Sequence, residues 1–193
     1  EHFETVYATD NSEKQLIHAK QILNVIYKKL PAEKTDFEDQ QFDLITVAQA
    51  VHWFDFDQFY PEIYRILKPN GIFAIIGYGL FKTNSNTNKI LEDFYYNIVG
   101  PFWDEERKYL DENYETIPFP LEELETLKFE NKFTWSYEQL IGYLETWSAV
   151  EHYKAHNNQN PLDLIREELK SAWETSEKKV TFPMLLRLGK LKA

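Results

Sequence analysis

The stretch from 41 to 79 constrains the fold of this chain more than any other part of the sequence. Residues 44–47 form a short apolar run without alternation, as in a parallel strand covered on both faces. A helix is expected over 59–67, and Pro69-Asn70-Gly71 is expected to end it in a turn. Residues 72–76 are apolar again, so the stretch predicts a right-handed βαβ unit.

The helix of this unit has an apolar face and a charged side. Its apolar positions at helical spacing are Phe59, Ile63, Ile66 and Leu67, and the charged positions off that face are Glu62, Arg65 and Lys68. This pattern predicts a helix that packs on the sheet with its charged residues outside the contact.

Two further strands are expected before this unit. Residues 3–9 read as a strand that ends at Asp10, a helix is expected over 13–19, and a weaker strand covers 24–29. Strands separated by helices or loops indicate an α/β fold with a parallel sheet. Ligands bind beyond the carboxyl ends of such strands, which places residues 48–53 at one edge of the expected site and Tyr78 at another.

Composition limits the classes of function. The 193 residues suit one domain with a subdomain, and the net charge of −11 argues against binding to nucleic acid or an anionic membrane. No apolar run is long enough to span a bilayer, and no signal segment opens the sequence. The absence of cysteine excludes disulfides and thiolate catalysis, and it fits a cytoplasmic protein. Aromatic residues reach 16%, a surplus that an apolar small-molecule pocket would use.

The second half of the chain departs from the strand–helix alternation. We expect residues 81–120 to form a helical lid over the carboxyl edge of the sheet, inserted into a core made of 1–80 and 121–193. The expected elements are helices over 88–99, 102–109, 137–153 and 161–175, with strands over 128–135 and 180–191. The predicted architecture is a Rossmann-like doubly wound sheet, mostly parallel, with antiparallel strands near the C-terminus.

Glycine is absent where a nucleotide-binding sheet usually needs it. A strand-end acid such as Asp10 normally follows a glycine-rich loop by about 20 residues. No glycine precedes Asp10, and the G-x-G spacing occurs only at Gly77-Tyr78-Gly79, which ends a strand and opens no helix. We therefore expect the sequence to be a piece of a longer protein, with the first strand, its glycine loop and a helix missing.

Several segments together resemble a known family. VYATDNS, LPAEKTDFEDQQFDLITVAQAVHWFD and EIYRILKPNG, in this order and spacing, resemble class I S-adenosylmethionine-dependent methyltransferases. The likeness is greatest to the methyltransferase type 11 branch with trans-aconitate methyltransferase-like proteins, and YLETWSAVEHY and VTFPMLLRLGK extend it over nearly the whole chain. The resemblance implies S-adenosylmethionine as cofactor, a small-molecule methyl acceptor, and weak or no cofactor binding without the glycine motif.

The resemblance also assigns roles to individual positions. Asp10 matches the acid that binds both ribose hydroxyls, with Asn11 beside it. The other implied cofactor contacts are Ala32 and Glu33 at the adenine, and Ala48 and Gln49 near the methionine moiety and sulfonium. His52 and Trp53 match positions that face the methyl-transfer centre.

Each candidate side chain has a structural alternative. His52 either removes a proton or is a hydrogen-bonded structural histidine. Trp53 is a candidate substrate contact that either stacks on the substrate or the adenine, or covers the sheet. Gln49 offers a polar anchor where an unused buried amide would be costly. Tyr78 and Trp147 are the other candidate substrate contacts, with packing and core positions as their alternatives.

Two arginines and two histidines offer weaker signals. Arg107 and Arg187 are able to bind a carboxylate bidentately, with a solvated or ion-paired arginine as the alternative. His152 and His156 lie at i, i+4, but no third ligand completes a metal site, so no metal is expected.

The resulting hypothesis is methyl transfer from S-adenosylmethionine to a small molecule, with carboxylates among the expected acceptors. One alternative is an NAD-dependent oxidoreductase, since Asp10 suits the ribose of NAD equally well, although no Tyr-x-x-x-Lys pair is present. The other is a non-catalytic relative that serves as an interaction module. The sequence sets neither the acceptor nor the oligomeric state.

Overall fold

The computed structural model describes residues 2–192, which fall into two compact units. The first unit holds the described residues up to Ile76, together with Pro118–Thr126 and the described residues from Arg187 onwards. The second unit holds Gly77–Ile117 and Leu127–Leu186. Among the described residues, no helix has the length and apolar character that crossing a membrane requires.

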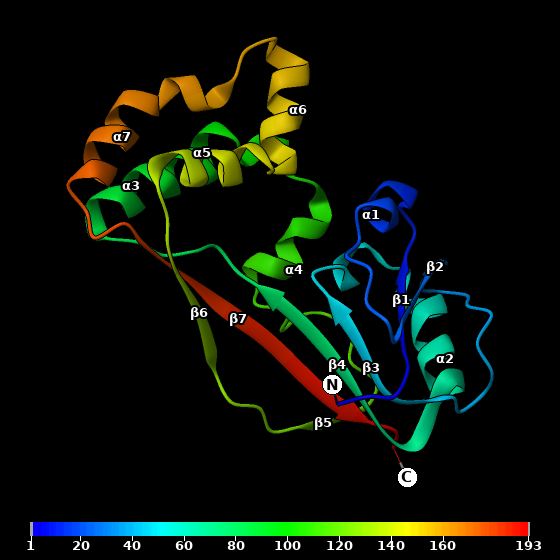
Figure 1. The fold of residues 1–193 in the computed structure, drawn as a ribbon. Helices are drawn as coiled ribbons and strands as arrows, with labels where there is room; N and C mark the ends of the chain where they lie inside the picture. The colour runs from blue at the N-terminus through cyan, green and yellow to red at the C-terminus, as the bar shows by residue number, and fades with distance from the viewer. Residues whose placement is uncertain (1, 193) are drawn as a thin grey trace. The chain divides into compact units, whose positions relative to one another are not determined.

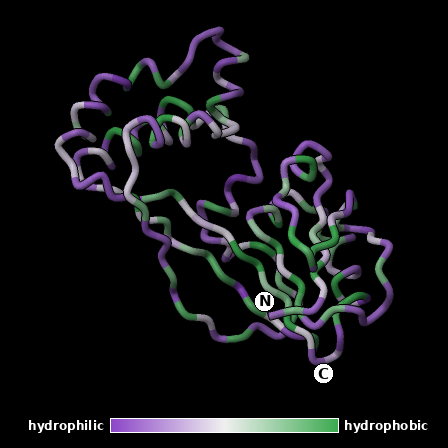
Figure 2. Tube along the Cα trace, in the orientation of Figure 1, coloured by the Kyte–Doolittle hydropathy of each residue, from purple (hydrophilic) through white to green (hydrophobic). Residues whose placement is uncertain are grey.

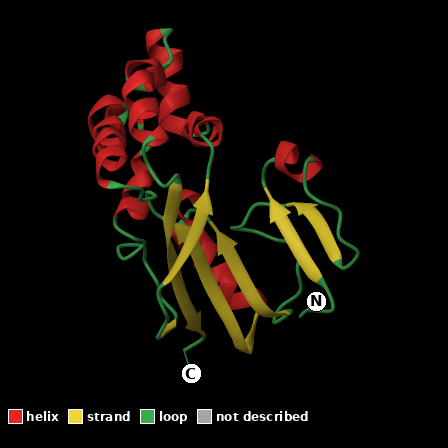
Figure 3. Ribbon diagram, turned by 60° about the vertical axis from the view of Figure 1, so that its left-hand side comes forward, coloured by secondary structure: helices red, strands yellow, loops and turns green. Residues whose placement is uncertain are grey.

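The first unit begins with a pair of parallel strands. β1 (Val6–Asp10) and β2 (Val25–Lys29) flank the short helix α1 (Glu13–Ile17) and form a two-stranded sheet of their own (Figure 3). Val6 pairs with Val25 and Asp10 pairs with Lys29, so the carboxyl ends of the two strands coincide.

The βαβ unit expected from the sequence is present in the structure. β3 (Phe42–Ala48) runs parallel to β4 (Leu67–Tyr78), and α2 (Phe56–Ile66) connects them (Figure 1). The carboxylate of Asp55 caps α2 by accepting hydrogen bonds from the backbone N–H groups of Asp57 and Gln58. The apolar stretches of the two strands are green in Figure 2.

The predicted turn at Pro69-Asn70-Gly71 is wrong. The helix ends at Ile66, and these three residues lie within β4, which starts at Leu67. The register explains the difference, because Phe42 pairs with Leu67 while Leu44 pairs with Ile72, with a shift between the two pairs. This irregularity absorbs the three residues without breaking the extended backbone.

The prediction that residues 44–47 are covered on both faces is also wrong. Val47 is buried, but Leu44 and Ile45 are half-buried and Thr46 is exposed. Within the described chain β3 has β4 as its single strand neighbour, because β1 and β2 form a separate sheet. The apolar run therefore has less cover than its composition indicates.

The larger sheet has the order β3-β4-β7-β5, and β6 also pairs with β7. β5 (Glu122–Leu124) and β6 (Phe129–Thr134) are both antiparallel to β7 (Lys179–Lys190). A parallel β3–β4 pair joined to antiparallel C-terminal strands confirms the predicted α/β, Rossmann-like class. The short strand β5 was not predicted.

The second unit is mostly helical. Its α-helices are α3 (Ser85–Asp93), α4 (Lys108–Asp111), α5 (Tyr137–Glu145), α6 (Ser148–Asn157) and α7 (Arg166–Glu174). α3 continues as a π-helix over Phe94–Ile98, and short 3₁₀ helices cover Gly100–Phe102, Glu105–Arg107 and Pro161–Leu164.

Three predicted helices are divided in the structure. The helix expected over 161–175 is the 3₁₀ turn Pro161–Leu164 followed by α7, with Ile165 between them. The helix expected over 137–153 is α5 followed by α6, because Trp147 has an extended backbone, with ψ of 131°, and stands as the N-cap of α6. The helix expected over 102–109 is similarly divided, because Trp103 is extended, with ψ of 144°, between two 3₁₀ turns. In each case a large apolar side chain occupies the interruption, which helical periodicity alone does not reveal.

The second unit takes in more of the chain than the expected lid. Its core combines residues of α3 and the following π-helix with residues of α5, α6 and α7, so residues 127–186 belong to it as well as 77–117. The boundaries therefore differ from the division into 1–80, 81–120 and 121–193. A lid function for 81–120 stays a prediction.

Candidate functional site

Asp10 lies at the carboxyl end of β1, in the position expected of a ribose-binding acid. Its side chain is exposed, and its Oδ1 accepts a hydrogen bond from the backbone N of Ser12 at 2.7 Å. In the described part of the chain the second carboxylate oxygen, Oδ2, has no hydrogen-bond donor. Asn11 is exposed beside it. A carboxylate with one oxygen held and one open fits the diol of a nucleoside.

The loop after β2 is fixed to the start of α2. Ala32 and Glu33 are both half-buried, and Oε1 of Glu33 accepts a hydrogen bond from the backbone N of Asp55 at 3.2 Å. Asp55 is the N-cap of α2, which follows the end of β3. The hydrogen bond therefore links Glu33, which is predicted to contact the adenine, to the start of α2. The segment before α2 carries Ala48 and Gln49, the other predicted cofactor contacts.

A buried carboxylate holds the remainder of this loop. Glu62 accepts hydrogen bonds from the backbone N of Thr35 at 2.8 Å, from Arg65 Nη2 at 2.7 Å and from Arg65 Nε at 2.9 Å. Arg65 continues the contact through the carbonyl of Phe37 and the carboxylate of Asp39. Glu62 is 8% exposed, which corrects the expectation that it lies outside the packed face.

The same contacts set the charge of the pair. The hydrogen bond from Arg65, together with those from Thr35, lowers the pKa of Glu62 to about 2, although burial opposes this shift. The hydrogen bonds to Glu62 and Asp39 raise the pKa of Arg65 in turn. Both groups are charged at neutral pH, and both lie on α2. The loop after β2 is held to this helix by the hydrogen bond from Thr35 to Glu62, by the hydrogen bond from Arg65 to the carbonyl of Phe37, and by the ion pair of Arg65 with Asp39 at 2.9 Å.

Gln49 adopts a strained backbone at the end of β3. Its φ is 52°, in the left-handed region that non-glycine residues avoid at a cost of about 1 kcal/mol. Its backbone N donates to the carbonyl of Ile76 at 2.8 Å, so the strain is held by pairing with β4. Strain of this kind concentrates at functional sites, which adds to the case for Gln49. Ala48, before it, is exposed and pairs with Ile76.

His52 and Trp53 differ sharply in exposure. Both lie in a 3₁₀ turn over Val51–Trp53, with ring centroids 5.0 Å apart. His52 is 5% exposed, whereas Trp53 is 54% exposed. A solvent-facing indole at a strand end suits stacking on a ligand, while the buried imidazole has the setting of a structural histidine. The role of His52 as a base stays a prediction.

Tyr78 and Trp147 both belong to the second unit. Tyr78 ends β4, is half-buried, and meets the ring of Phe182 edge-on at 5.3 Å. Trp147 is buried among aromatic rings that include Trp103, at 5.5 Å, and Tyr143, at 6.2 Å. Trp147 therefore occupies a core position, and a direct contact of either residue with substrate stays a prediction.

Arg107 is the centre of an unpredicted polar cluster in the second unit. Its Nε donates to the hydroxyl of Tyr95 at 2.7 Å, and its guanidinium lies 4.5 Å from the ring centroid of Trp103. The carboxylate of Asp111 is 3.7 Å from Nε and accepts a hydrogen bond from the same Tyr95 hydroxyl. The Arg107 side chain is 19% exposed, so this charge is largely removed from solvent.

The donors of Arg107 are only partly used. Among the described residues neither Nη atom has a hydrogen-bond acceptor, although the guanidinium charge acts on the hydroxyls of Tyr114 and Tyr143. Burial raises the pKa of Tyr95, Tyr114 and Tyr143, so these hydroxyls stay neutral at physiological pH. A guanidinium with open donors among neutral hydroxyls is suited to an anion, and a carboxylate matches its planar fork.

Sequence reasoning noted Arg107 but gave no reason to prefer it over Arg187. The structure separates them: Arg187 forms a two-bond ion pair with Glu123, through Nε at 2.7 Å and Nη2 at 2.9 Å. The tyrosines around Arg107 are spread over some fifty residues of sequence, from 95 to 143, with no local spacing that links them. Only the tertiary structure brings these tyrosines together around Arg107.

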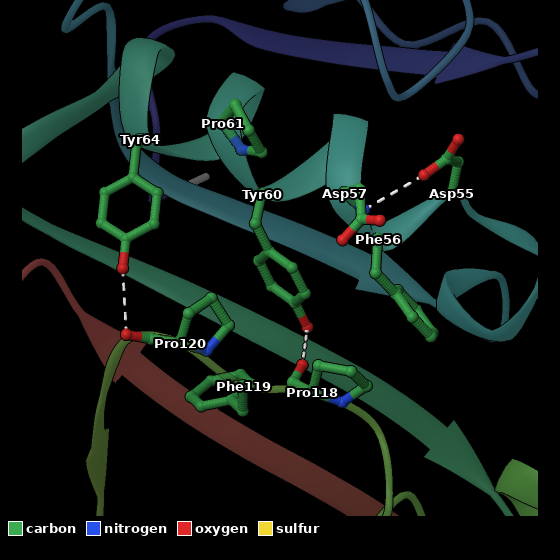
Figure 4. Close-up of a pocket in the computed structure, with 9 residues that line it drawn as sticks. All are labelled: Asp55, Phe56, Asp57, Tyr60, Pro61, Tyr64, Pro118, Phe119 and Pro120. Atoms are coloured by element: carbon green, nitrogen blue, oxygen red, sulfur yellow. Dashed lines mark hydrogen bonds between the residues drawn. The ribbon is translucent and has the colours of Figure 1, made fainter.

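A groove in the first unit lies along α2, apart from the predicted residues. It has a volume of about 600 Å³ and runs between α2 and Pro118-Phe119-Pro120 (Figure 4). The hydroxyl of Tyr60 donates to the carbonyl of Pro118, and that of Tyr64 donates to the carbonyl of Pro120 at 2.9 Å. None of the residues predicted as a site from the sequence lines this groove, so we do not assign it to the cofactor.

Known proteins resemble this chain over nearly its whole length. The methyltransferase domain family matches residues 1–75. A Dictyostelium discoideum protein named "Putative methyltransferase" is 35% identical over 197 residues, covering 98% of this chain and 75% of that protein.

Solved structures agree. A "Putative Type II Methyltransferase" from Anaeromyxobacter dehalogenans is 35% identical with a TM-score of 0.88, covering 99% of this chain and 83% of that one. A Bacillus halodurans structure, 19% identical with a TM-score of 0.52, covers 98% of this chain and 84% of that one, and it shares the fold.

The chain belongs to the class I S-adenosylmethionine-dependent methyltransferases. S-adenosylmethionine is therefore its cofactor, and its partner in the reaction is a methyl acceptor. This result confirms the family that the sequence resembled, while the roles of individual residues remain predictions.

Proposed function

We propose that this methyltransferase transfers the methyl group of S-adenosylmethionine to a small molecule that carries a carboxylate. The observation that carries this proposal is Arg107, a largely buried guanidinium whose Nη atoms have no hydrogen-bond acceptor among the described residues. Asp111 lies 3.7 Å from its Nε, and neutral tyrosine hydroxyls surround the rest of the group. A carboxylate bound there would satisfy donors that otherwise lack partners. The net charge of −11 disfavours a nucleic-acid acceptor, and we also propose a cytoplasmic location on the absence of cysteine.

On this proposal the first unit holds the cofactor. The open oxygen of Asp10 would bind the ribose hydroxyls with Asn11 beside it, and Ala32 and Glu33 would line the adenine. Two features support these roles: the exposed strand-end carboxylate and the loop pinned to α2 by Glu62.

The strand end after β3 would hold the reacting part of the cofactor. Ala48 and the strained Gln49 would lie near the methionine moiety, and Trp53 would present its exposed ring to a ligand. When bound, S-adenosylmethionine supplies a methyl group already activated on sulfonium. The protein then has to align the acceptor and exclude water, so no catalytic triad is needed. His52 is the proposed group for proton removal where the acceptor requires it.

Ligand binding tests the cofactor half of this proposal. Thermal stability of the full-length protein is measured with S-adenosylmethionine, S-adenosylhomocysteine and NAD. Stabilisation by the first two alone is expected, because binding to the native state raises the melting temperature by mass action. Stabilisation by NAD alone would favour an oxidoreductase, and stabilisation by none would favour a non-catalytic module. The comparisons with known proteins favour neither alternative.

Variants of Arg107 test the acceptor half. A panel of small carboxylic acids and their amides is screened for methyl transfer. For any acid that reacts, Arg107→Met is expected to raise KM at least about tenfold, the effect of a lost charge-assisted bond. Arg166→Met is the matched control, because Arg166 pairs with Asp163 at the surface. Equal activity on acids and amides, with KM unchanged in Arg107→Met, would exclude a carboxylate at this position.

A further inference from the structure

β6 is an edge strand whose residues are all exposed. It pairs antiparallel with β7 along one edge, from Phe129 with Met184 to Thr134 with Lys179. In the described part of the chain no strand pairs with its other edge, and Figure 1 shows none beside it there. Such an edge presents backbone N–H and C=O groups to any strand of matching sequence.

The sequence of β6 is symmetric in chemical character about Asn131. The five residues Phe129-Glu130-Asn131-Lys132-Phe133 place an aromatic ring at each end and opposite charges on either side of the centre. Because side chains alternate along a strand, the two rings share one face with Asn131, and the two charges share the other. The rings are large and exposed, Phe129 at 50% and Phe133 at 41%.

The two charges are as exposed as the rings. Their side chains are 57% exposed at Glu130 and 69% at Lys132, and they pair with each other along the strand at 2.9 Å. Edge strands that are protected from self-association usually carry charges that repel in a symmetric pairing. Here the order of the charges does the opposite, since antiparallel pairing about Asn131 places Glu130 of each copy against Lys132 of the other.

We propose that β6 pairs antiparallel with β6 of a second copy of this chain, about a twofold axis at Asn131. Phe129 then lies opposite Phe133 of the other copy on one face, and Glu130 lies opposite Lys132 on the other. Aromatic pairs and opposite-charge pairs are the cross-strand combinations that stabilise antiparallel sheets. A twofold axis also gives a closed, isologous interface that stops at the dimer.

The charge balance of β6 favours a second copy over other partners. The chain carries a net charge of −11, which opposes association of two copies over most surfaces. β6 itself is neutral, with one acid and one base, so the pairing does not bring like charges together. A peptide of arbitrary sequence would match the backbone edge but not the reversed order of the charges and rings.

Charge reversal tests the proposal by sedimentation equilibrium of the purified protein. Wild type is expected to dimerise. Glu130→Lys and Lys132→Glu each place like charges opposite one another twice, so each is expected to weaken dimerisation at least about tenfold. The double variant, with both reversals, restores opposite charges and is expected to dimerise as wild type does.

Mixing the two single variants gives the sharpest result. One carries two lysines and the other two glutamates, so the mixture is expected to form heterodimers while each alone stays mostly monomeric. The matched controls are Glu151→Lys and Lys154→Glu on α6. These residues form an ion pair at 2.9 Å, with Glu151 exposed and Lys154 half-buried, and either substitution should leave the dimer unchanged. Circular dichroism checks that each variant is folded.

Three results would overturn the proposal. They are a wild-type protein that stays monomeric at every concentration, single variants that dimerise as tightly as wild type, and a mixture without heterodimers. The outcome is independent of methyl transfer, because no residue of β6 belongs to the proposed cofactor or acceptor site.

Discussion

Glu62→Gln removes the charge at the centre of the contact between α2 and the loop after β2. The glutamine side chain has nearly the same shape, so the substitution leaves packing almost unchanged. It replaces the charged acceptor of Arg65 with a neutral amide, while Arg65 keeps Asp39 and the carbonyl of Phe37 as acceptors. Arg65 is partly exposed and keeps Asp39 as a charged partner, so the substitution costs the attraction to the Glu62 carboxylate and leaves no unpaired buried charge.

The magnitude follows from the pKa of Glu62. A fall from 4.5 in the unfolded chain to about 2 in the folded protein sets an upper limit of about 3 kcal/mol. Arg65 is 33% exposed, so solvent screens part of the attraction, and we expect about 1–2 kcal/mol. Because the folded pKa lies below the unfolded one, this stabilisation is fully present above about pH 4.5 and is lost as the pH falls towards 2.

Urea unfolding of wild type and Glu62→Gln at several pH values between 7 and 3 measures the effect. The difference in free energy of unfolding is expected to be constant from pH 7 to about 5 and to shrink at lower pH. Glu125→Gln is the control, since Glu125 is exposed and belongs to the same unit. Equal stabilities at pH 7, or a difference that persists unchanged at pH 3, would refute the assigned role of Glu62.

Three other substitutions follow from the structure. Gln49→Gly relieves the left-handed backbone at φ of 52° and should raise the free energy of unfolding by up to about 1 kcal/mol. The same substitution should weaken S-adenosylmethionine binding. A calorimetric titration that shows unchanged affinity would contradict the cofactor role of Gln49. Gly77→Ala places a Cβ in steric overlap with the buried ring of Tyr114 and should destabilise by about 1–3 kcal/mol in urea unfolding. The control Gly142→Ala meets no atom within 4 Å and should not. Trp53→Ala should weaken cofactor binding with little change in melting temperature, because the indole is 54% exposed; a large loss of stability would indicate packing instead.

The spacing of apolar residues correctly predicted one helix and one strand of the first unit. The apolar spacing of Phe59, Ile63 and Ile66 located α2, and the apolar run at 72–76 located β4. The break between α5 and α6 at Trp147 was not predicted, because no proline or glycine marks it. The indole would also be buried in one continuous helix, so its burial gives no signal of the break. The strand β5 has three residues, two of them glutamates, and exists through pairing with β7 rather than through its own composition.

Some residues of the candidate site follow from local sequence, and others depend on tertiary contacts. Asp10, Gln49 and Trp53 follow directly from strand ends, which the sequence shows. Glu62 was misplaced because its burial depends on Thr35, whose position in a loop has no periodic signal. The Arg107 cluster depends on tyrosines that only tertiary packing brings together, so it was beyond any reading of local spacing.

Each unit is assembled from segments that are far apart in the chain, and this affects synthesis on the ribosome. The first unit is complete only when Arg187 and the strand end after it reach β5, where Arg187 binds Glu123 across 64 residues. All of Leu127–Leu186 is translated in between. During that interval β5 has no partner strand, and contacts of such long range form slowly. During synthesis the first unit should therefore depend on chaperones more than the helical second unit does.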